Sequence, residues 1–185
     1  MTIADILGCG RAANVRPKDD FFQTPLECTA SIVAAEANFL PKTIWEPCAG
    51  NDAIAGFLEA MGYRVIKTDL NRKTDGIDKI DFLLERKPQA LAIVTNPPFT
   101  LAREIIVHAK GLGVTYMALL LKSDFFNCGE SADVWDIWPP ARIHALTWRP
   151  DFRRQGRPTM TCSWYVWDSK SPTCSGFTPM RRLKA

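Results

Sequence analysis

Histidine and closely spaced cysteines are scarce in this sequence. Only two of its 185 residues are histidine, and none of its six cysteines forms a Cys-x-x-Cys pair, so a zinc site is not expected. No apolar run approaches the roughly 18 residues of a membrane helix, and no basic segment followed by an apolar core opens the chain. We therefore expect a cytoplasmic protein with reduced thiols, no metal and no membrane partner.

A strong excess of charge of one sign is also missing. The net charge is +3, and the 46% hydrophobic and 23% charged residues are typical of a globular protein. A nucleic-acid partner is permitted by this charge but not required. We expect a flexible arm over residues 1–18, a single domain over residues 19–168 and an extended basic tail over residues 169–185.

Strands and helices alternate along the expected domain. Residues 26–39 form an apolar helix with Thr24 as its expected cap and Pro25 in its first turn. A strand, a turn of small residues and a helix closed by Gly62 follow over residues 43–62. The almost wholly apolar residues 114–121 are typical of a central parallel strand that is covered on both faces.

One stretch organises the chain: a short apolar run, residues 92–95, that ends in Asn96-Pro97-Pro98-Phe99. The prolines end the strand, because they lack a backbone donor and force the preceding residue into an extended conformation. The Asn96 side-chain oxygen and the Pro97 carbonyl are then two acceptors beside the Phe99 ring, which suits a planar group carrying an NH2. An ordinary proline turn is the alternative.

Asn-Pro-Pro-Phe resembles the catalytic motif of the amino-methyltransferases, which move a methyl group from S-adenosylmethionine to adenine N6 or to a glutamine side chain. Further motifs in the family's order extend this resemblance over residues 19–168. It implies the class I methyltransferase fold, a Rossmann-like doubly wound α/β sheet that is mostly parallel with an antiparallel C-terminal strand. Residues 142–148 and 161–167 would be its last two strands. The implied catalytic residues are Asn96, Pro97, Pro98 and Phe99.

The resemblance also implies the cofactor, S-adenosylmethionine. The segment before the first helix resembles one that lies against the methionine end of the cofactor, and the small residues up to Gly50 resemble the family's first motif, where the backbone approaches the cofactor closely. An acid ends the next strand where the ribose hydroxyls are bound, and another resembles the acid that bonds the adenine amino group. The implied cofactor-binding residues are Gln23, Thr24, Pro25, Glu46, Pro47, Cys48, Ala49, Gly50, Asp69, Leu70, Asp81, Phe82 and Asn96.

Local alternatives compete with several of these roles. Asp52 stands where many members of the family have a second glycine, which puts cofactor affinity in question unless Asn51 or Asp52 tops the turn or caps the helix. Asp81 can instead cap a helix, with Phe82 in the core. We expect His108 to be a packed or solvated residue and not a base.

The loop between the last two expected strands is basic. It contains four arginines beside Trp148 and Phe152, which suits phosphates and stacked bases, although a solvated hairpin loop is the alternative. The ring of Phe125 is either a wall of the substrate pocket or part of the core. The candidate substrate-binding residues are Phe99, Phe125, Arg153, Arg154 and Arg157.

Together these motifs predict an S-adenosylmethionine-dependent N-methyltransferase of the DNA adenine-N6 type, which must flip out a base that lies within a duplex. The alternatives are RNA adenine or a protein glutamine as the substrate, or a catalytically silent nucleic-acid-binding protein with this fold. The expected partner is nucleic acid, with DNA favoured, and the oligomeric state is not indicated. Strict sequence specificity is not expected, because the chain has no room for a separate recognition domain.

Overall fold

The computed structural model describes residues 23–71, 74–127, 132–171 and 176–180. The strands are β1 (Thr43–Glu46), β2 (Arg64–Asp69), β3 (Asp78–Lys79), β4 (Ala92–Thr95), β5 (Tyr116–Lys122), β6 (Arg142–Leu146), β7 (Cys162–Asp168) and β8 (Gly176–Met180). The α-helices are α2 (Leu26–Ala35), α3 (Ala53–Ala60), α4 (Ala102–Gly111) and α5 (Ala132–Ile137). Three single 3-10 turns are η1 (Phe82–Leu84), η2 (Phe99–Leu101) and η3 (Phe125–Asn127). The expected arm, residues 1–18, lies outside the described residues.

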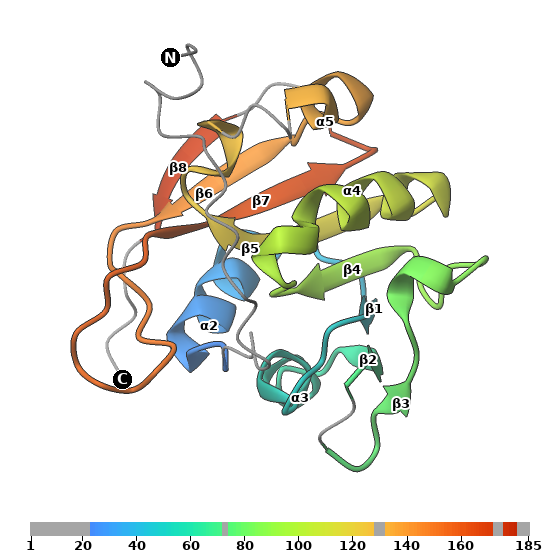
Figure 1. The fold of residues 1–185 in the computed structure, drawn as a ribbon, viewed down its shortest axis with the longest axis horizontal. Coiled ribbons are helices and arrows are strands. Elements are labelled where there is room, and N and C mark those ends of the chain that lie inside the picture. Colours follow the sequence, from blue (N-terminus) through green and yellow to red (C-terminus); the bar gives the residue numbers. More distant parts are fainter. Residues whose placement is uncertain (1–22, 72–73, 128–131, 172–175, 181–185) are drawn as a thin grey trace, which may run out of the picture.

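All eight strands belong to one sheet with the order β3-β2-β1-β4-β5-β7-β6-β8 (Figure 1). Strand β7 is antiparallel to its neighbours β5 and β6, whereas every other pairing among the described strands is parallel. The order reverses between β1 and β4, because the chain moves outward from β1 to β3 before it returns to β4. The predicted fold, a doubly wound and mostly parallel sheet with an antiparallel C-terminal strand, is therefore confirmed.

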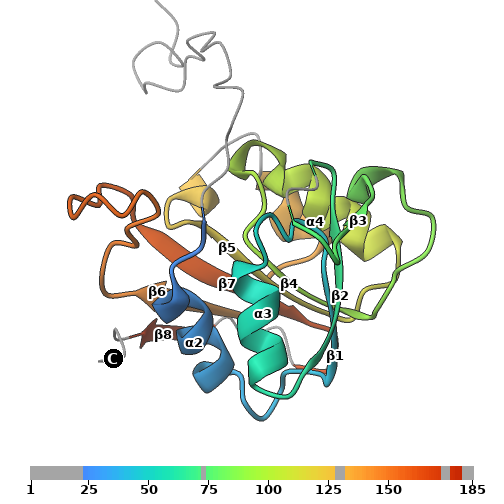
Figure 2. The ribbon, with the colours of Figure 1, turned by 90° about the horizontal axis from the view of Figure 1, so that it is seen from below.

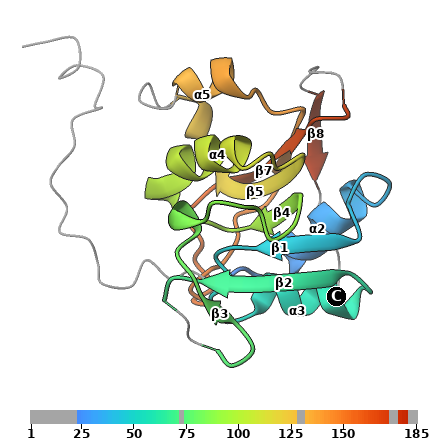
Figure 3. The same cartoon turned by 90° about the vertical axis from the view of Figure 1, so that its right-hand side faces the viewer.

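The helices cover both faces of the sheet, as Figures 2 and 3 show. Side chains of successive strand residues point to opposite faces. In β5, Tyr116, Ala118 and Leu120 pack with residues of α2 and α3, while Met117 and Leu119 pack with residues of α4 and α5. This two-sided burial explains why the strand reads as an unbroken apolar run.

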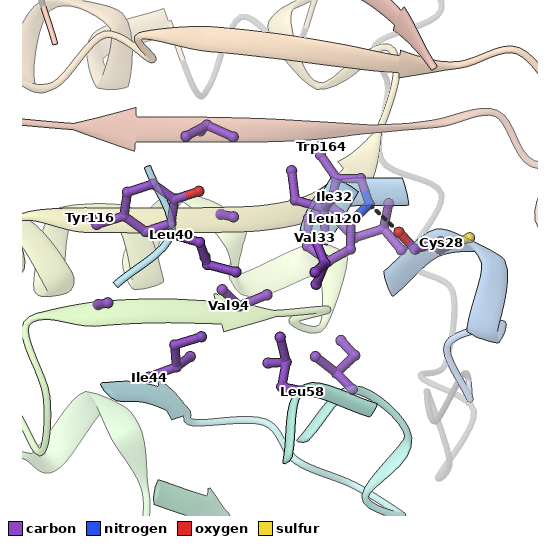
Figure 4. Packing of buried hydrophobic residues seen from close by; sticks show 14 of the residues in the cluster. Cys28, Ile32, Val33, Leu40, Ile44, Leu58, Val94, Tyr116, Leu120 and Trp164 are labelled. Carbon is purple, nitrogen blue, oxygen red and sulfur yellow. Dashed lines mark hydrogen bonds between the residues drawn. The ribbon is translucent and has the colours of Figure 1, made fainter. Parts of the chain in front are cut away.

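Figure 4 shows the packing between α2 and the sheet. Ile32 and Val33 of α2 lie against Val94 and Leu120, and the indole N–H of Trp164 donates to the Cys28 carbonyl at 3.0 Å. The bond joins residues 136 positions apart in sequence. It fixes the first described helix to β7, and with it the segment that precedes the helix.

Helix α2 begins at Leu26 as predicted, but its C-terminal end and its cap differ from the prediction. It ends at Ala35 instead of Phe39, because the next residue, Glu36, turns its carboxylate toward Arg142 and His144. Thr24 is not the cap, since Pro25 holds the N-cap position and no side chain caps the helix.

Three elements were not predicted. Strand β3 has only two residues and lies in what reads as a polar loop, and α5 is a short helix of six residues. Strand β8 forms within the expected tail and pairs with β6 over five residues. In the described part of the chain, no helix is both long and apolar enough to cross a membrane.

Candidate active site

The carboxyl ends of four neighbouring parallel strands form one edge of the sheet. Strands β1, β2 and β4 end at Glu46, Asp69 and Thr95, and β5 ends at Lys122. In open α/β sheets ligands bind at this edge, where the strand order reverses. Three of the motifs singled out in the sequence follow these strand ends directly.

The turn after β1 is held against β2 by backbone contacts. The Gly50 amide donates to the Asp69 carboxylate at 2.9 Å, and the Ala49 amide donates to the Thr68 carbonyl at 3.1 Å. Gly50 has a φ of 55°, which glycine adopts without steric cost. The contact places the acid at the end of β2 beside the small-residue turn.

Asp52 has a left-handed backbone conformation, which favours glycine. Its φ is 72° and it occupies the N-cap position of α3, but its side chain makes no capping hydrogen bond. The carboxylate instead lies 3.2 Å from the Nζ of Lys67 on β2. Aspartate tolerates left-handed backbone better than most residues, so the turn keeps its shape without the second glycine.

Acidic groups converge around the buried start of this turn. The Glu46 carboxyl is 2% exposed, its Oε2 has no hydrogen-bond partner among the described residues, and burial raises its pKa well above the ordinary value. Burial also raises the pKa of Cys48 to about 12, and the charges of Asp69, Glu46 and Asp81 act in the same direction. The carboxyl has a backbone hydrogen bond with Ala55. This acidic turn, residues 46–50 with Asp69, fits a ligand that carries positive charge, because a cation would pair with the Oε2 that has no partner among the described residues.

After β3, Asp81 caps a helical turn and Phe82 lies in the core, which is the alternative to a cofactor-binding role. The Asp81 carboxylate accepts from the Leu83 amide at 3.0 Å and caps η1. Phe82 is buried, with its ring centroid 5.0 Å from that of Trp45 and 5.1 Å from that of His108. His108 is thus a packed residue of α4, and its interaction with Phe82 is an edge contact of the rings.

The Asn-Pro-Pro-Phe segment turns away from β4 at the same edge. Pro97 is buried and Pro98 leads into η2, so the chain leaves the sheet directly after Asn96. The Asn96 amide nitrogen donates to the Thr24 hydroxyl at 3.1 Å, which joins this segment to Gln23-Thr24-Pro25 in front of α2. Phe99 packs against both core clusters, and the Nζ of Lys122 lies 5.7 Å from its ring centroid.

The candidate substrate residues lie in two separate places. Phe125 packs edge-on against Trp135 and Tyr165, with both ring centroids 5.7 Å away, so the core alternative describes this ring well. The arginine loop, residues 149–157, projects from the sheet between β6 and β7 (Figure 2). All four of its arginines are exposed, and the Asp151 carboxylate shapes it by accepting from the Gly156 amide at 2.6 Å.

Sequence reasoning missed the contacts that tie these pieces together. Lys122 was not singled out, although it is the charged residue that ends the otherwise apolar strand β5. Thr24 was expected to cap a helix or to touch the cofactor, and its bond to Asn96 spans 72 residues. Within the described ranges, no three His, Cys, Asp or Glu side chains are grouped so that they could hold a metal ion.

No family model matches the sequence, and a search of curated proteins found no match. The fold does match solved structures. A protein described as a modification subunit of a type I restriction enzyme from Vibrio vulnificus is 12% identical, with a TM-score of 0.61, over 88% of this chain and 48% of that one. This chain thus spans about half of that subunit's length.

Two further structures match over most of both chains. A protein described as a class I S-adenosylmethionine-dependent methyltransferase from Listeria monocytogenes is 12% identical, with a TM-score of 0.59, over 95% of this chain and 69% of that one. A protein described as an RNA methyltransferase from Pyrococcus horikoshii is 13% identical, with a TM-score of 0.60, over 89% of this chain and 95% of that one. The chain therefore has the fold of the class I S-adenosylmethionine-dependent methyltransferases.

Proposed function

We propose that this protein transfers a methyl group from S-adenosylmethionine to an exocyclic amine, and that the acceptor is adenine N6 in DNA. The observation that supports this most directly is the position of Asn96. Asn96 directly follows β4, and the acidic turn directly follows the neighbouring strand β1. The proposed hydrogen-bond acceptor for the target amine therefore lies beside the proposed site for the positively charged cofactor.

The acidic turn would hold the cofactor, which supplies an electrophilic methyl group when bound. The free oxygen of buried Glu46 would meet a positive group of the ligand. The Asp69 carboxylate already accepts from the Gly50 and Asn71 amides, at 2.9 and 2.6 Å, and its remaining lone pairs are open to ribose hydroxyls. Asp81 and Phe82 would then lie on the adenine side, where the cap of η1 fixes their backbone.

The Asn-Pro-Pro-Phe segment would hold the target amine. Asn96 and the Pro97 carbonyl accept hydrogen bonds from its NH2 and so direct the nitrogen lone pair, while the Phe99 ring stacks on the base. None of these groups is a strong base, so the rate would come from positioning. Well-oriented reactants can lower a barrier by about 7–11 kcal/mol.

DNA is favoured over a protein substrate by the exposed arginine loop, because guanidinium groups pair well with phosphates. A restriction modification subunit and an RNA methyltransferase among the structural neighbours support a nucleic-acid substrate as well. A glutamine side chain in a protein would have no need of these arginines. Asp52 does not argue for a silent protein, since it keeps the turn in the conformation of glycine.

The test is transfer of labelled methyl to single-stranded and duplex DNA, to RNA and to a glutamine-containing peptide. Asn96→Ala should lower turnover on adenine DNA by about 10²–10³, the effect of removing a preorganised transition-state hydrogen bond. Its melting temperature and its affinity for S-adenosylmethionine should stay near those of the parent protein.

Asn38→Ala is the matched control, because Asn38 is an exposed residue that follows α2. It should keep full activity. Full activity in Asn96→Ala, or a loss that follows a fall in melting temperature, would contradict the proposed role of Asn96. Transfer to the peptide alone would replace DNA with protein as the substrate.

A further inference from the structure

The hydrogen bond between Asn96 and Thr24 has a role in the choice of acceptor. Thr24 is 6% exposed, and its hydroxyl oxygen accepts from the Asn96 amide nitrogen at 3.1 Å. The two ends of an amide side chain have nearly the same shape but opposite hydrogen-bonding character, since one accepts and the other donates twice. Without a fixed partner, rotation by half a turn would exchange them.

Thr24 is itself held in place by a well-anchored helix. The Pro25 carbonyl accepts from the Cys28 amide at 3.0 Å, and the Cys28 carbonyl accepts from the Trp164 indole at 3.0 Å. Both the hydroxyl and the end of β4 therefore belong to rigid parts of the fold. In this structure the threonine oxygen accepts from the Asn96 NH2.

We propose that Thr24 is a positioning residue that turns the Asn96 carbonyl oxygen toward the substrate, and that it thereby selects an acceptor atom bearing N–H over one that is a carbonyl oxygen. The proposal rests on the proposed function. Because one N–H of Asn96 is bonded to Thr24, the other end of the amide, its oxygen, points away from Thr24, where we place the target amine. An adenine NH2 satisfies that acceptor, whereas the C6 carbonyl of hypoxanthine leaves two acceptors facing each other, which is costly in a site shielded from water.

The test compares Thr24→Val with Thr24→Ser. Valine matches threonine in size but offers no acceptor, while serine keeps the hydroxyl. Binding is measured to single-stranded DNA of mixed sequence and to the same strand with hypoxanthine in place of every adenine. In Thr24→Val the preference for the adenine strand should fall about tenfold, and kcat on that strand should fall by at least as much, because one hydrogen bond no longer fixes the amide.

Thr24→Ser should restore both the preference and kcat. Thr29→Val is the matched control, since Thr29 is a buried threonine of α2 whose hydroxyl has no hydrogen-bond partner among the described residues. That variant should keep the parent preference. If both valine variants melt at a lower temperature but only Thr24→Val loses the preference for the adenine strand, the loss of preference is not caused by lower stability.

The possible outcomes test the role of Thr24 separately from the proposed methyl transfer. If the parent transfers methyl to adenine and Thr24→Val keeps the parent preference and kcat, the role of Thr24 is wrong and the proposed function stands. If Thr29→Val changes the preference equally, the effect belongs to helix packing, and the inference is overturned. If the parent transfers methyl to no amine, both proposals fail.

Discussion

At the scale of single residues, the buried carboxyl of Glu46 has a strongly raised pKa. Its carboxyl is buried at the end of β1, and burial, with further contributions from the charges of Asp52 and Asp69, raises its pKa well above 4.5. A carboxyl whose pKa is raised on folding stabilises the fold fully below its ordinary pKa. That stability is lost as the pH rises through the raised value.

Glu46→Gln should therefore melt at a higher temperature than the parent at pH 7–8, with less dependence on pH, because glutamine has no proton to lose. The same change should weaken S-adenosylmethionine binding by about 1.5–3 kcal/mol, the worth of a hydrogen bond to a charged group. Thermal melts across pH and titration calorimetry measure the two effects. Asp124→Asn, at an exposed residue after β5, is the control and should change neither.

Proton release gives an independent check of the Glu46 assignment. A cation beside the carboxyl favours its ionised form, so binding should release a proton and affinity should rise with pH up to the raised pKa. Calorimetry in two buffers with different ionisation enthalpies would show a release in the parent and none in Glu46→Gln. Equal heats in both buffers for the parent would count against the assignment.

At the scale of elements, the arginine loop is the proposed contact to a nucleic-acid backbone, and its four arginines are exposed. Its base is anchored by Trp148 and Phe152, which pack against the core cluster under α2, so its exposed arginines can be changed without cost to the core. Replacing Arg153, Arg154 and Arg157 together by Ala should weaken binding to all DNA sequences alike. Each lost phosphate contact should remove about 0.9 from the slope of log affinity against log salt on B-DNA.

A second triple variant controls for net charge. Arg64 on β2, and Arg86 and Lys87 in the loop between η1 and β4, are exposed basic residues, and their replacement removes the same charge. Salt titrations of DNA binding compare the two variants. The same slope in both would show that the loop acts only through overall charge.

The elements also show what local sequence patterns can predict. Strands β1, β2, β4 and β5 were predicted because short apolar runs meet small residues, prolines or an acid at their ends, and these signals are local. Strand β8 was missed because its pairing with β6 is remote in sequence and it contains Pro179. The roles of the site residues stay predictions, but their convergence on one edge could be expected from the order of the strands.

At the scale of the whole molecule, a buried polar network joins α2 to the last strands. The fully buried Glu36 carboxylate accepts from Arg142 through two nitrogens at 2.8 Å, from Tyr116 at 3.1 Å, and lies 2.6 Å from His144 Nε2. Arg142 and His144 are two residues apart on β6 and so share a face. This spacing can be seen in the sequence, but it does not indicate that Glu36 is their partner. Asp168 completes the network through Arg142 at 3.1 Å.

This network should make the fold sensitive to acid. Burial alone would raise the pKa of Glu36, but the hydrogen bonds from His144 and Arg142 outweigh burial and lower it below 4.5. The stability that Glu36 contributes is therefore present above pH 4.5 and is lost as the pH falls through the lowered value. Glu36→Gln should cost about 3–5 kcal/mol at neutral pH, because Arg142 is left without its main partner.

Urea unfolding between pH 3 and pH 7 measures this cost. Glu59→Gln is the control, since Glu59 forms a partly exposed ion pair with Lys67 that is worth about 0–1 kcal/mol. The parent should lose stability on acidification more steeply than Glu36→Gln does. Parallel curves for the two proteins would show that the network contributes no pH dependence.

The anchoring of α2 by Trp164 and Arg142 has a consequence for the order of events on the ribosome. The segment with Thr24 is made first, but the residues that seat its helix are made more than 100 positions later, as the 136-residue span of the Trp164–Cys28 bond shows. A nascent chain that ends before β7 therefore has Asn96 but lacks the anchor that holds its positioning partner. Under the proposed function, methyl transfer is therefore expected only after translation has passed β7.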